Sequence, residues 1–439
     1  MQEGLKIIGE SLSRLRILLL GPECHPDRVS IPRVTYRHAV ALAQLHEVTL
    51  VARSSVEEDL RRAQAPFQAI EVVRTAIDDR IFAWCFRKIF RSNPATQALT
   101  AFRYPFSIGF EWRAWRQLRR RIFGGEFDVV LRLLPMASVL PSPFAFFLRK
   151  GPIPFVIGPV TGGLSWPAGF RRQNEKEWIF SLRSLYRFLP FARSTYRHAS
   201  AIIAASSQTY SEFGAYRDKM FFIPEPGIES SLCVSDSRNS ADDGKLKLIF
   251  VGGLTPRKAC DLALRGASSL LRNNLAHFIV VGDGPEQNRL EQLTRSLGIE
   301  KAVSFCGWVS RAEVLSYLRS ADALVFPSIR DNGAGVVFEA LASGAVPVVA
   351  DVGGPGDIVH SQVGFKVPVN NEEDMTLCIE KILTNLATNR VLLNRIRRQG
   401  MSYAQGHLTW HAKAQSTTQV LNWVVNRGAK PHLPPPKML

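Results

Sequence analysis

The sequence lacks the residue groups on which metal and disulfide chemistry depend. Its six cysteines are scattered, with no C-x-x-C pair and no cluster of cysteine and histidine at metal-ligand spacing. No D-x-D triplet, a common holder of divalent cations, occurs anywhere in the 439 residues. We therefore expect a protein of a reduced, cytoplasmic compartment that carries no metal and no other cofactor.

Long apolar runs suited to a membrane are also missing. The longest uncharged stretch, residues 151–170, has the length of a bilayer span, but nine of its twenty residues are glycine or proline. Such a segment cannot form a membrane helix. The first twenty residues mix charges into a short apolar run and show no small-residue cleavage site, so they do not indicate a signal peptide. A cytoplasmic location is expected, with the inner face of the cytoplasmic membrane as an option.

Acidic residues are few relative to basic ones. The formal charge is +17, and residues 101–200 hold 16 lysines and arginines against five acidic residues. A surface charged in this way attracts phosphate, carried by lipid headgroups or by nucleic acid. Because no RNA-binding aromatic motif, helix-turn-helix signature or zinc finger is present, nucleic acid is the weaker candidate. Peripheral association with an anionic membrane is the expected consequence.

Two basic segments have the composition of helices that lie on a membrane surface. Residues 112–123 and 178–188 mix large apolar side chains with arginines at helical spacing. The same pattern is typical of amphipathic helices that pack on a core and leave their arginines in water. Both interpretations stay open at the level of sequence.

The order of apolar segments predicts two doubly wound α/β domains, since the chain is too long for one compact core. Short buried strands alternate with helical patterns up to residue 224, and the alternation restarts at residue 246 after a polar stretch. The predicted divisions are an N-terminal Rossmann-like domain at residues 1–226, a linker at 227–245, a C-terminal Rossmann-like domain at 246–402, a terminal helix at 403–428 that crosses back to the first domain, and a flexible tail at 429–439.

The strongest local signal lies in residues 326–344. A strand there ends in a polar, glycine-rich turn, and a helix begins near Gly335, so free backbone N–H groups and the positive end of the helix dipole face the cleft. This is a place for a phosphate. Asp331 in the turn could accept hydrogen bonds from a hexose, and Glu339 in the helix from a ribose. Alternatively, Asp331 only shapes the turn and Glu339 only favours the helix dipole.

This segment resembles the E-x7-E region of the retaining glycosyltransferase family 4, the group that includes glycogen synthases and has the two-domain GT-B fold. Asp331 stands where the first glutamate usually does, and Glu339 matches the second. An aspartate is one methylene shorter, so the donor sugar is expected to be held differently. The resemblance implies two Rossmann-like domains that face each other across a cleft.

A second stretch, residues 250–263, is similar to the family's G-R-L-x-x-x-K-G sequence. Lys258 falls on the family's lysine, whose ammonium would neutralise the donor diphosphate as the sugar leaves. Gly253 occupies the place of the family's arginine, and Arg257 is the candidate to restore the missing charge. Without the resemblance, such a Lys/Arg pair in a loop would usually be only solvated.

Weaker matches extend the resemblance through the C-terminal half. Residues 280–285, 305–309, 350–359 and 408–413 resemble in order the family's G-x-G-P turn, the strand end that meets the nucleotide base, the following loop and the start of the terminal helix. The residues expected to act in catalysis are Lys258, Asp331, Glu339 and Arg257. The residues expected to bind the donor are Gly252, Gly253, Gly282, Gly284, Trp308, Asn332, Gly333, Ala334, Gly335 and Val336.

The first domain departs more from the family. The loop at residues 21–27 has no glycine pair, and residues 131–135 contain no histidine, although members often carry both features. Residues 158–163 do resemble a Gly-Pro-x-x-Gly-Gly loop of some members. The residues expected to bind the acceptor are His25, Gly162 and Gly163.

The resemblance implies a retaining hexosyltransferase that uses a UDP-, GDP- or ADP-sugar and a glycan or polyprenyl-linked acceptor. Cell-envelope or exopolysaccharide biosynthesis is the expected setting. A second hypothesis, suggested by Gly253 and the missing histidine, is a catalytically inactive protein of the same fold that binds sugar nucleotides or polysaccharide. An epimerase or phosphorylase is disfavoured, because neither extra acid/base groups in the first domain nor a Schiff-base lysine can be located.

Overall fold

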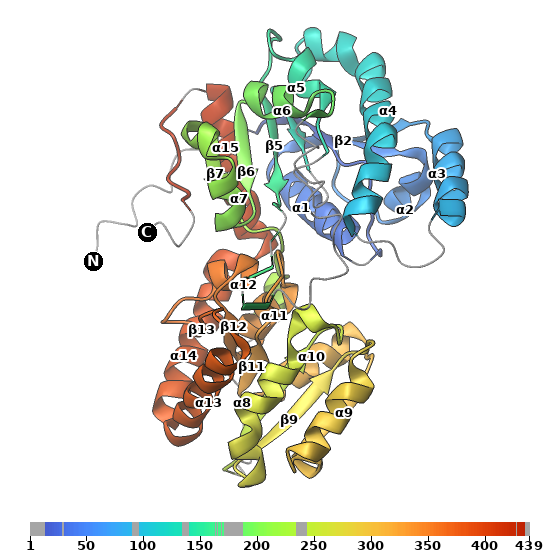
Figure 1. Ribbon diagram of the computed structural model, residues 1–439. Coiled ribbons are helices and arrows are strands. Elements are labelled where there is room, and N and C mark those ends of the chain that lie inside the picture. Colours follow the sequence, from blue (N-terminus) through green and yellow to red (C-terminus); the bar gives the residue numbers. More distant parts are fainter. Residues whose placement is uncertain are drawn as a thin grey trace.

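The computed structural model describes residues 14–28, 30–89, 96–133, 140–162, 164, 166–167, 169–170, 188–233, 244–426 and 428–434. These residues form one seven-stranded and one six-stranded sheet. All strand pairs in both sheets are parallel. Figure 1 shows the sheets in two lobes, which we call the first and the second domain.

The strands of the first sheet lie in the order β3-β2-β1-β4-β5-β6-β7. Their bounds are β1 Arg16–Leu20, β2 Glu47–Arg53, β3 Ala69–Val73, β4 Val129–Arg132, β5 Phe155–Val160, β6 Ala201–Ala204 and β7 Met220–Phe222. The helices in this part of the chain are α1 Ile31–Leu45, α2 Glu57–Arg62, α3 Ala76–Ile89, α4 Thr96–Phe123, α5 Pro143–Phe147, α6 Ala192–His198 and α7 Ser207–Glu212.

The second sheet has the order β10-β9-β8-β11-β12-β13. Its strands are β8 Leu246–Val251, β9 Ala276–Val281, β10 Val303–Gly307, β11 Ala323–Phe326, β12 Val346–Ala350 and β13 Phe365–Val367. The helices that follow β8 are α8 Cys260–Arg272, α9 Gln287–Ser296, α10 Arg311–Ser320, α11 Gly335–Ser343, α12 Gly353–Ile358, α13 Glu372–Thr388, α14 Arg390–Tyr403 and α15 Trp410–Asn426.

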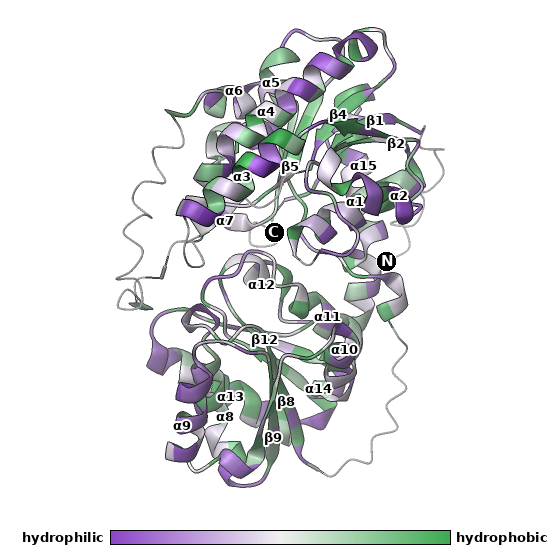
Figure 2. Ribbon diagram, turned by 90° about the vertical axis from the view of Figure 1, so that its right-hand side faces the viewer, coloured by the Kyte–Doolittle hydropathy of each residue, from purple (hydrophilic) through white to green (hydrophobic). Residues whose placement is uncertain are grey.

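Both faces of the first sheet are buried, and strand β1 shows how the sequence achieves this. Successive strand side chains point to opposite faces. Ile17 and Leu19 pack in one apolar cluster with residues of α1 and α15, whereas Leu18 and Leu20 pack in another with residues of α4 and α5. In Figure 2 the strands are largely coloured as hydrophobic, whereas α9 on the outside is largely hydrophilic. A continuous apolar run is therefore required of each central strand.

The strand orders fix where a ligand can bind. In each sheet the chain reverses its direction of winding between the first strand and the fourth, at β1/β4 and at β8/β11. Loops that leave adjacent strands at such a switch point run to opposite faces and open a crevice at the carboxyl edge. The loops after β8 and β11, residues 252–259 and 327–334, border this crevice in the second domain.

The chain passes between the domains twice, and the two crossings pair with each other. Ile228 N donates to Leu408 O at 3.0 Å, and Trp410 N donates to Ile228 O at 3.0 Å. Helix α15 then packs along α1 of the first domain. His38 and His46 lie there against Thr417 and Thr418, with ring nitrogen to hydroxyl distances of 3.0 and 2.7 Å.

The end of the chain also touches the first sheet. Phe222 N, in β7, donates to Leu433 O at 2.7 Å. The tail that the sequence predicts to be flexible is thus held at one point within its described part, residues 428–434.

A buried ion pair lies at the carboxyl end of β4, where some family members carry a histidine. Arg132 Nε lies 2.5 Å from Glu111 Oε1, and Arg132 also donates to Leu140 O at 2.8 Å. Ser142 Oγ donates to Glu111 Oε2 at 2.5 Å. Burial raises the pKa of Glu111, and the charge of Arg132 opposes that rise. The arginine therefore ties α4 to the loop after β4.

Among the described helices, none combines the length and the apolar character that a bilayer crossing requires.

Candidate functional site

The loop after β8 brings Lys258 to the carboxyl edge of the second sheet. Pro256–Lys258 form one 3-10 turn, and the next residue, Ala259, adopts a left-handed conformation with φ 51°. The carbonyl of Arg257 accepts a hydrogen bond from Ile329 N at 3.1 Å, which fastens the turn to the loop after β11. The ammonium of Lys258 lies 4.7 Å from the centre of the Phe326 ring. The two loops of the crevice are thus held together.

Lys258 and Asp331 meet directly in this crevice. Lys258 Nζ donates to Asp331 Oδ2, and both side chains are largely buried. The sequence predicts both residues at one site, although it assigns the lysine to the donor diphosphate and the aspartate to the sugar. In this structure the two opposite charges satisfy each other, so a donor would have to exchange this pair for its own contacts.

Asp331 also joins Lys258 to the start of α11. Its other oxygen, Oδ1, accepts from Ala334 N at 3.1 Å. Ala334 itself adopts a left-handed conformation with φ 43°, and the helix begins at Gly335 with no side-chain cap at Ala334. The positive end of a helix dipole and the ammonium therefore border the same space. Gly333 precedes Ala334 in the turn, and Val336 is the second residue of α11.

Glu339 lies one turn further along α11 and is held by an arginine that the sequence analysis missed. Arg311, the first residue of α10, places Nε and a terminal nitrogen each 3.0 Å from Glu339 Oε1. Burial raises the pKa of Glu339, while the charges of Arg311 and Arg33 lower it. The carboxylate predicted to meet a ribose is therefore positioned by a cation from the neighbouring helix.

Glycines at the carboxyl edge allow the β8 and β9 loops to approach closely. A β-carbon at Gly282 would collide with the carbonyl of Gly252, and one at Gly284 with the backbone of Leu254. Gly252 and Gly282 also have φ of 155° and 137°, which side chains rarely adopt. Gly253 has no such crowding, because a β-carbon there would lie 3.8 Å from Asp283 O. The departure from the family at Gly253 is thus not enforced by packing.

Trp308, expected near the nucleotide base, follows β10 at the same edge. Its side chain is 81% exposed. At this exposure the ring is accessible to a ligand at the edge of the sheet.

The first domain contacts the loop after β11, the predicted donor loop, through the glycine-rich segment after β5. Asn332 Nδ2 donates to Gly162 O at 3.2 Å, and Arg330 Nε donates to Leu164 O at 2.9 Å. Gly162 N in turn donates to Thr209 Oγ1 at 2.5 Å. The predicted acceptor loop and the predicted donor loop are therefore neighbours across the cleft. Gly163 lies outside the described residues.

His25 has a structural role in this structure. Its Nε2 lies 2.9 Å from Asp59 Oδ2, and its Nδ1 accepts from Asp27 N and Arg28 N at 3.1 and 3.2 Å. The ring is buried. Both nitrogens hold the loop between β1 and α1, so no ring nitrogen is left to bind an acceptor, contrary to the expectation from sequence.

Glu225, at the first domain crossing, is a further buried group that the sequence analysis did not select. A β-carbon on Gly333 would lie 3.7 Å from Glu225 Oε2, so the carboxylate of Glu225 faces the loop after β11. Burial raises the pKa of Glu225, the charge of Lys413 opposes this, and Asp331 adds to it. Lys413 donates to the carbonyl of Glu225. No local pattern distinguishes this glutamate, because its partners come from α15 and from the loop after β11.

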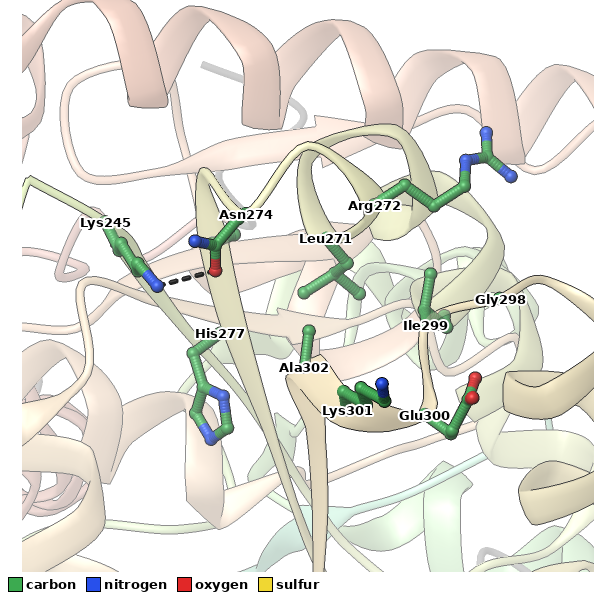
Figure 3. Close-up of a pocket in the computed structure, with 11 residues that line it drawn as sticks. Lys245, Leu271, Arg272, Asn274, His277, Gly298, Ile299, Glu300, Lys301 and Ala302 are labelled. Carbon is green, nitrogen blue, oxygen red and sulfur yellow. Dashed lines mark hydrogen bonds between the residues drawn. The ribbon is translucent and has the colours of Figure 1, made fainter.

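A cavity of about 410 Å³ lies away from this crevice, at the opposite end of the second sheet. Figure 3 shows Lys245, His277 and Lys301 among its lining residues, with Lys245 bonded to Asn274. Lys245 precedes β8 and Lys301 precedes β10, so the cavity borders the amino ends of these strands. It contains none of the residues predicted to bind donor or acceptor.

Residues 235–399 match the family model described as glycosyl transferases group 1. These residues include the second sheet, so the similarity to this family lies in the second domain. A D-inositol 3-phosphate glycosyltransferase of Kineococcus radiotolerans is 27% identical over 251 residues, which cover 50% of this chain and 56% of that relative. The chain spans about half the length of the curated relatives it matches. The loops of Lys258 and Asp331 both lie inside the matched residues.

Solved structures agree with the fold over nearly the whole chain. HepE of Anabaena, crystallised with UDP, has a TM-score of 0.60 at 18% identity and covers 93% of this chain and 100% of its own. Sucrose-phosphate synthase of Thermosynechococcus elongatus has a TM-score of 0.63 at 16% identity and covers 94% and 100%. The predicted fold class is confirmed: the chain has two facing Rossmann-like domains, the GT-B arrangement.

Proposed function

We propose that the chain transfers a hexose from a nucleotide-diphosphate sugar to a glycan or lipid-linked acceptor in the cleft between its domains. One observation carries the proposal: Lys258, Asp331 and the uncapped start of α11 converge at the switch point of the second sheet. Such a site suits a diphosphate. The UDP complex of HepE and the glycosyltransferase names of relatives support a nucleotide-sugar donor.

The proposed donor pose assigns each group a task. The diphosphate replaces Asp331 as the partner of Lys258 and lies at the start of α11. Asp331, once released, accepts hydrogen bonds from hexose hydroxyls, and Glu339 accepts them from the ribose. Arg257, which is exposed beside Lys258, adds a second cation at the rim of the cleft. Asn332 and Gly333 lie next to Asp331 in the loop after β11 and approach the sugar there.

The proposed chemistry follows from these positions. The bond between the anomeric carbon and the diphosphate oxygen breaks, and the acceptor hydroxyl bonds to the same carbon with retention of configuration. A donor phosphate oxygen takes the hydroxyl proton. Negative charge grows on the diphosphate, where Lys258 and the helix dipole stabilise it. No divalent metal is required in this scheme, so transfer should continue in EDTA.

A donor screen tests the proposal. Purified protein is incubated with UDP-, GDP- and ADP-sugars, and release of the nucleoside diphosphate is measured. Wild type should hydrolyse one donor slowly without an acceptor, and Glu339→Gln should release it at least tenfold more slowly. Glu373→Gln, at an exposed position of α13, is the matched control and should behave as wild type. Saturable binding without turnover would instead support the inactive binding protein.

We also propose that the enzyme works at an anionic membrane and that α3 makes the contact. Ile77, Ile81 and Trp84 are 74%, 48% and 54% exposed. Their spacing of four and three residues places them on one helical face. The ammonium of Lys88 lies 4.5 Å from the centre of the Trp84 ring. An apolar stripe edged by cations is typical of helices that lie in the headgroup layer.

The basic segment at residues 112–123, first selected from sequence, exposes less apolar surface than α3. In α4, Ala114 and Leu118 are buried in the core, and only the ends of the segment, Trp112 and Phe123, expose apolar side chains. Residues 112–123 therefore form a core-packed amphipathic helix with solvated arginines. Residues 178–187 lie outside the described part of the chain.

Vesicle co-sedimentation tests the membrane contact. Binding should rise when phosphatidylglycerol is added to phosphatidylcholine vesicles, and Ile81→Asp should remove most of it. Leu377→Asp is the matched control, because Leu377 is similarly exposed on α13 of the second domain. Equal binding of both variants, or binding independent of the anionic lipid, would refute the assignment to α3.

A further inference from the structure

Arg33 is an incompletely paired cation in the first turn of α1. Its Nε is buried and has no hydrogen-bond partner among the described residues. The nearby carboxylates are already engaged: Glu229 lies 3.3 Å from Arg37, and Asp27 lies 3.8 Å from Arg62. A buried guanidinium N–H without an acceptor is costly. The site therefore has capacity for one more acceptor.

Arg33 of the first domain and Arg311 of the second domain are close enough for their charges to interact. Burial lowers the pKa of Arg33, and the positive charge of Arg311 lowers it further. Arg33 and Arg311 both act on the pKa of Glu339, which places the three side chains in one cluster. Figure 1 shows α1 on the underside of the first domain, facing the second domain that carries α10 and α11. Arg311 is thus bonded to Glu339, while Arg33 acts on the same carboxylate through its charge.

We infer that Arg33 and Arg311 form a phosphate-binding clamp that spans the cleft and closes around an anionic substrate group. A guanidinium matches the geometry of phosphate with two parallel hydrogen bonds. A phosphate would supply the acceptor that Arg33 Nε lacks and would remove the repulsion between the two cations. The inference rests on the proposed function, because it assigns the clamp to a substrate of the same cleft.

The phosphate has two possible sources, the diphosphate of the donor and a phosphate on the acceptor. Lys258 separates them, because it belongs to the donor site and is paired with Asp331, whereas Arg33 reaches the cleft from the first domain. A donor diphosphate held by the clamp must depend on both Arg33 and Lys258. An acceptor phosphate must depend on Arg33 alone.

Calorimetric titration of the full chain with inorganic pyrophosphate and inorganic phosphate, at low ionic strength, tests the clamp. Arg33→Gln should weaken binding of at least one anion about tenfold or more, the usual weight of a charged hydrogen bond. Arg116→Gln, an exposed arginine of α4, is the control for the loss of one positive charge and should bind as wild type. Arg33→Lys should recover only part of the affinity, since an ammonium lacks the planar guanidinium that binds phosphate with two parallel hydrogen bonds. Thermal unfolding verifies that each variant is folded.

The two sources give different results with Lys258→Met. Loss of the same binding event in Arg33→Gln and Lys258→Met assigns the clamp to the donor diphosphate. Phosphate binding that survives Lys258→Met but not Arg33→Gln assigns it to the acceptor. Unchanged titrations of Arg33→Gln with both anions would overturn the inference. Because the titration needs no turnover, an inactive protein would refute the proposed function and leave this result standing.

Discussion

Replacement of Lys258 by methionine separates the electrostatic task of the ammonium from its structural one. Methionine keeps the length and the apolar stem but cannot meet the charge of a leaving diphosphate. A preorganised group aimed at a developing charge contributes about 3 to 4 kcal/mol, so kcat should fall about 100- to 1000-fold. Release of nucleoside diphosphate from the donor found in the screen measures this fall.

The same substitution leaves Asp331 without its cation. Breaking a fully buried pair costs about 3 to 5 kcal/mol, and the partial exposure of both side chains reduces this to about 1 to 2 kcal/mol. Asp331 is 14% exposed, which places it nearer the buried case than the surface case. Urea unfolding should show this loss, and Asp331→Asn added to Lys258→Met should recover most of it.

The double variant decides between two roles for Lys258. The comparison is with Asp331→Asn alone, because Asp331 itself belongs to the proposed donor site. If the lysine acts on the diphosphate, Lys258→Met/Asp331→Asn turns over at least tenfold more slowly than Asp331→Asn. If the lysine only neutralises Asp331, the two variants turn over alike. Equal turnover of these two variants, or Lys258→Met within tenfold of wild-type kcat, would refute the assignment of the donor site.

Further predictions concern stability and packing. Arg132→Met should destabilise by about 3 to 5 kcal/mol in urea unfolding because Glu111 is left buried and charged; adding Glu111→Gln should restore part of it, and no restoration would contradict a charge-based cause. Burial lowers the pKa of His46 to about 4, so below its unfolded value of about 6.5 the unfolded state binds the proton more readily. Stability should therefore fall by about 2 kcal/mol between pH 7.5 and 5, and His46→Gln should lose this dependence. Gly284→Ala should cost about 1 to 3 kcal/mol, since its methyl group meets the Leu254 backbone; a neutral result would contradict that packing.

The fold was accessible from sequence wherever strands are buried on both faces. The runs at β1 and β8 are continuous and apolar because helices cover both sides, and this signal is local. The same analysis missed α3 as an element, because its apolar residues are divided between a side where Phe82 packs on rings of α4 and the exposed face of Ile77, Ile81 and Trp84. It also missed β13, which has three residues and is defined by its pairing with β12.

The candidate site divides in the same way. Lys258, Asp331 and Glu339 could be selected from the sequence because each belongs to a short strand–turn–helix segment with a recognisable pattern. Arg311 and Glu225 were not, because their partners are supplied by other elements. The role inferred for Arg33 depends on Arg311 and Glu339, which belong to the second domain. His25 was misassigned because its two partners, the loop amides and Asp59, become neighbours only after the first domain has folded.

The paired crossings at Ile228 and Thr409 limit how the cleft can open. Because both connections run side by side and are bonded to each other, the two lobes can rotate about one axis near this pair but cannot twist or slide independently. A substrate that contacts both lobes would therefore gain all of its contacts in one rotation of the domains. For the same reason the N-terminal half cannot be isolated intact, since removal of α15 would uncover the apolar face of α1.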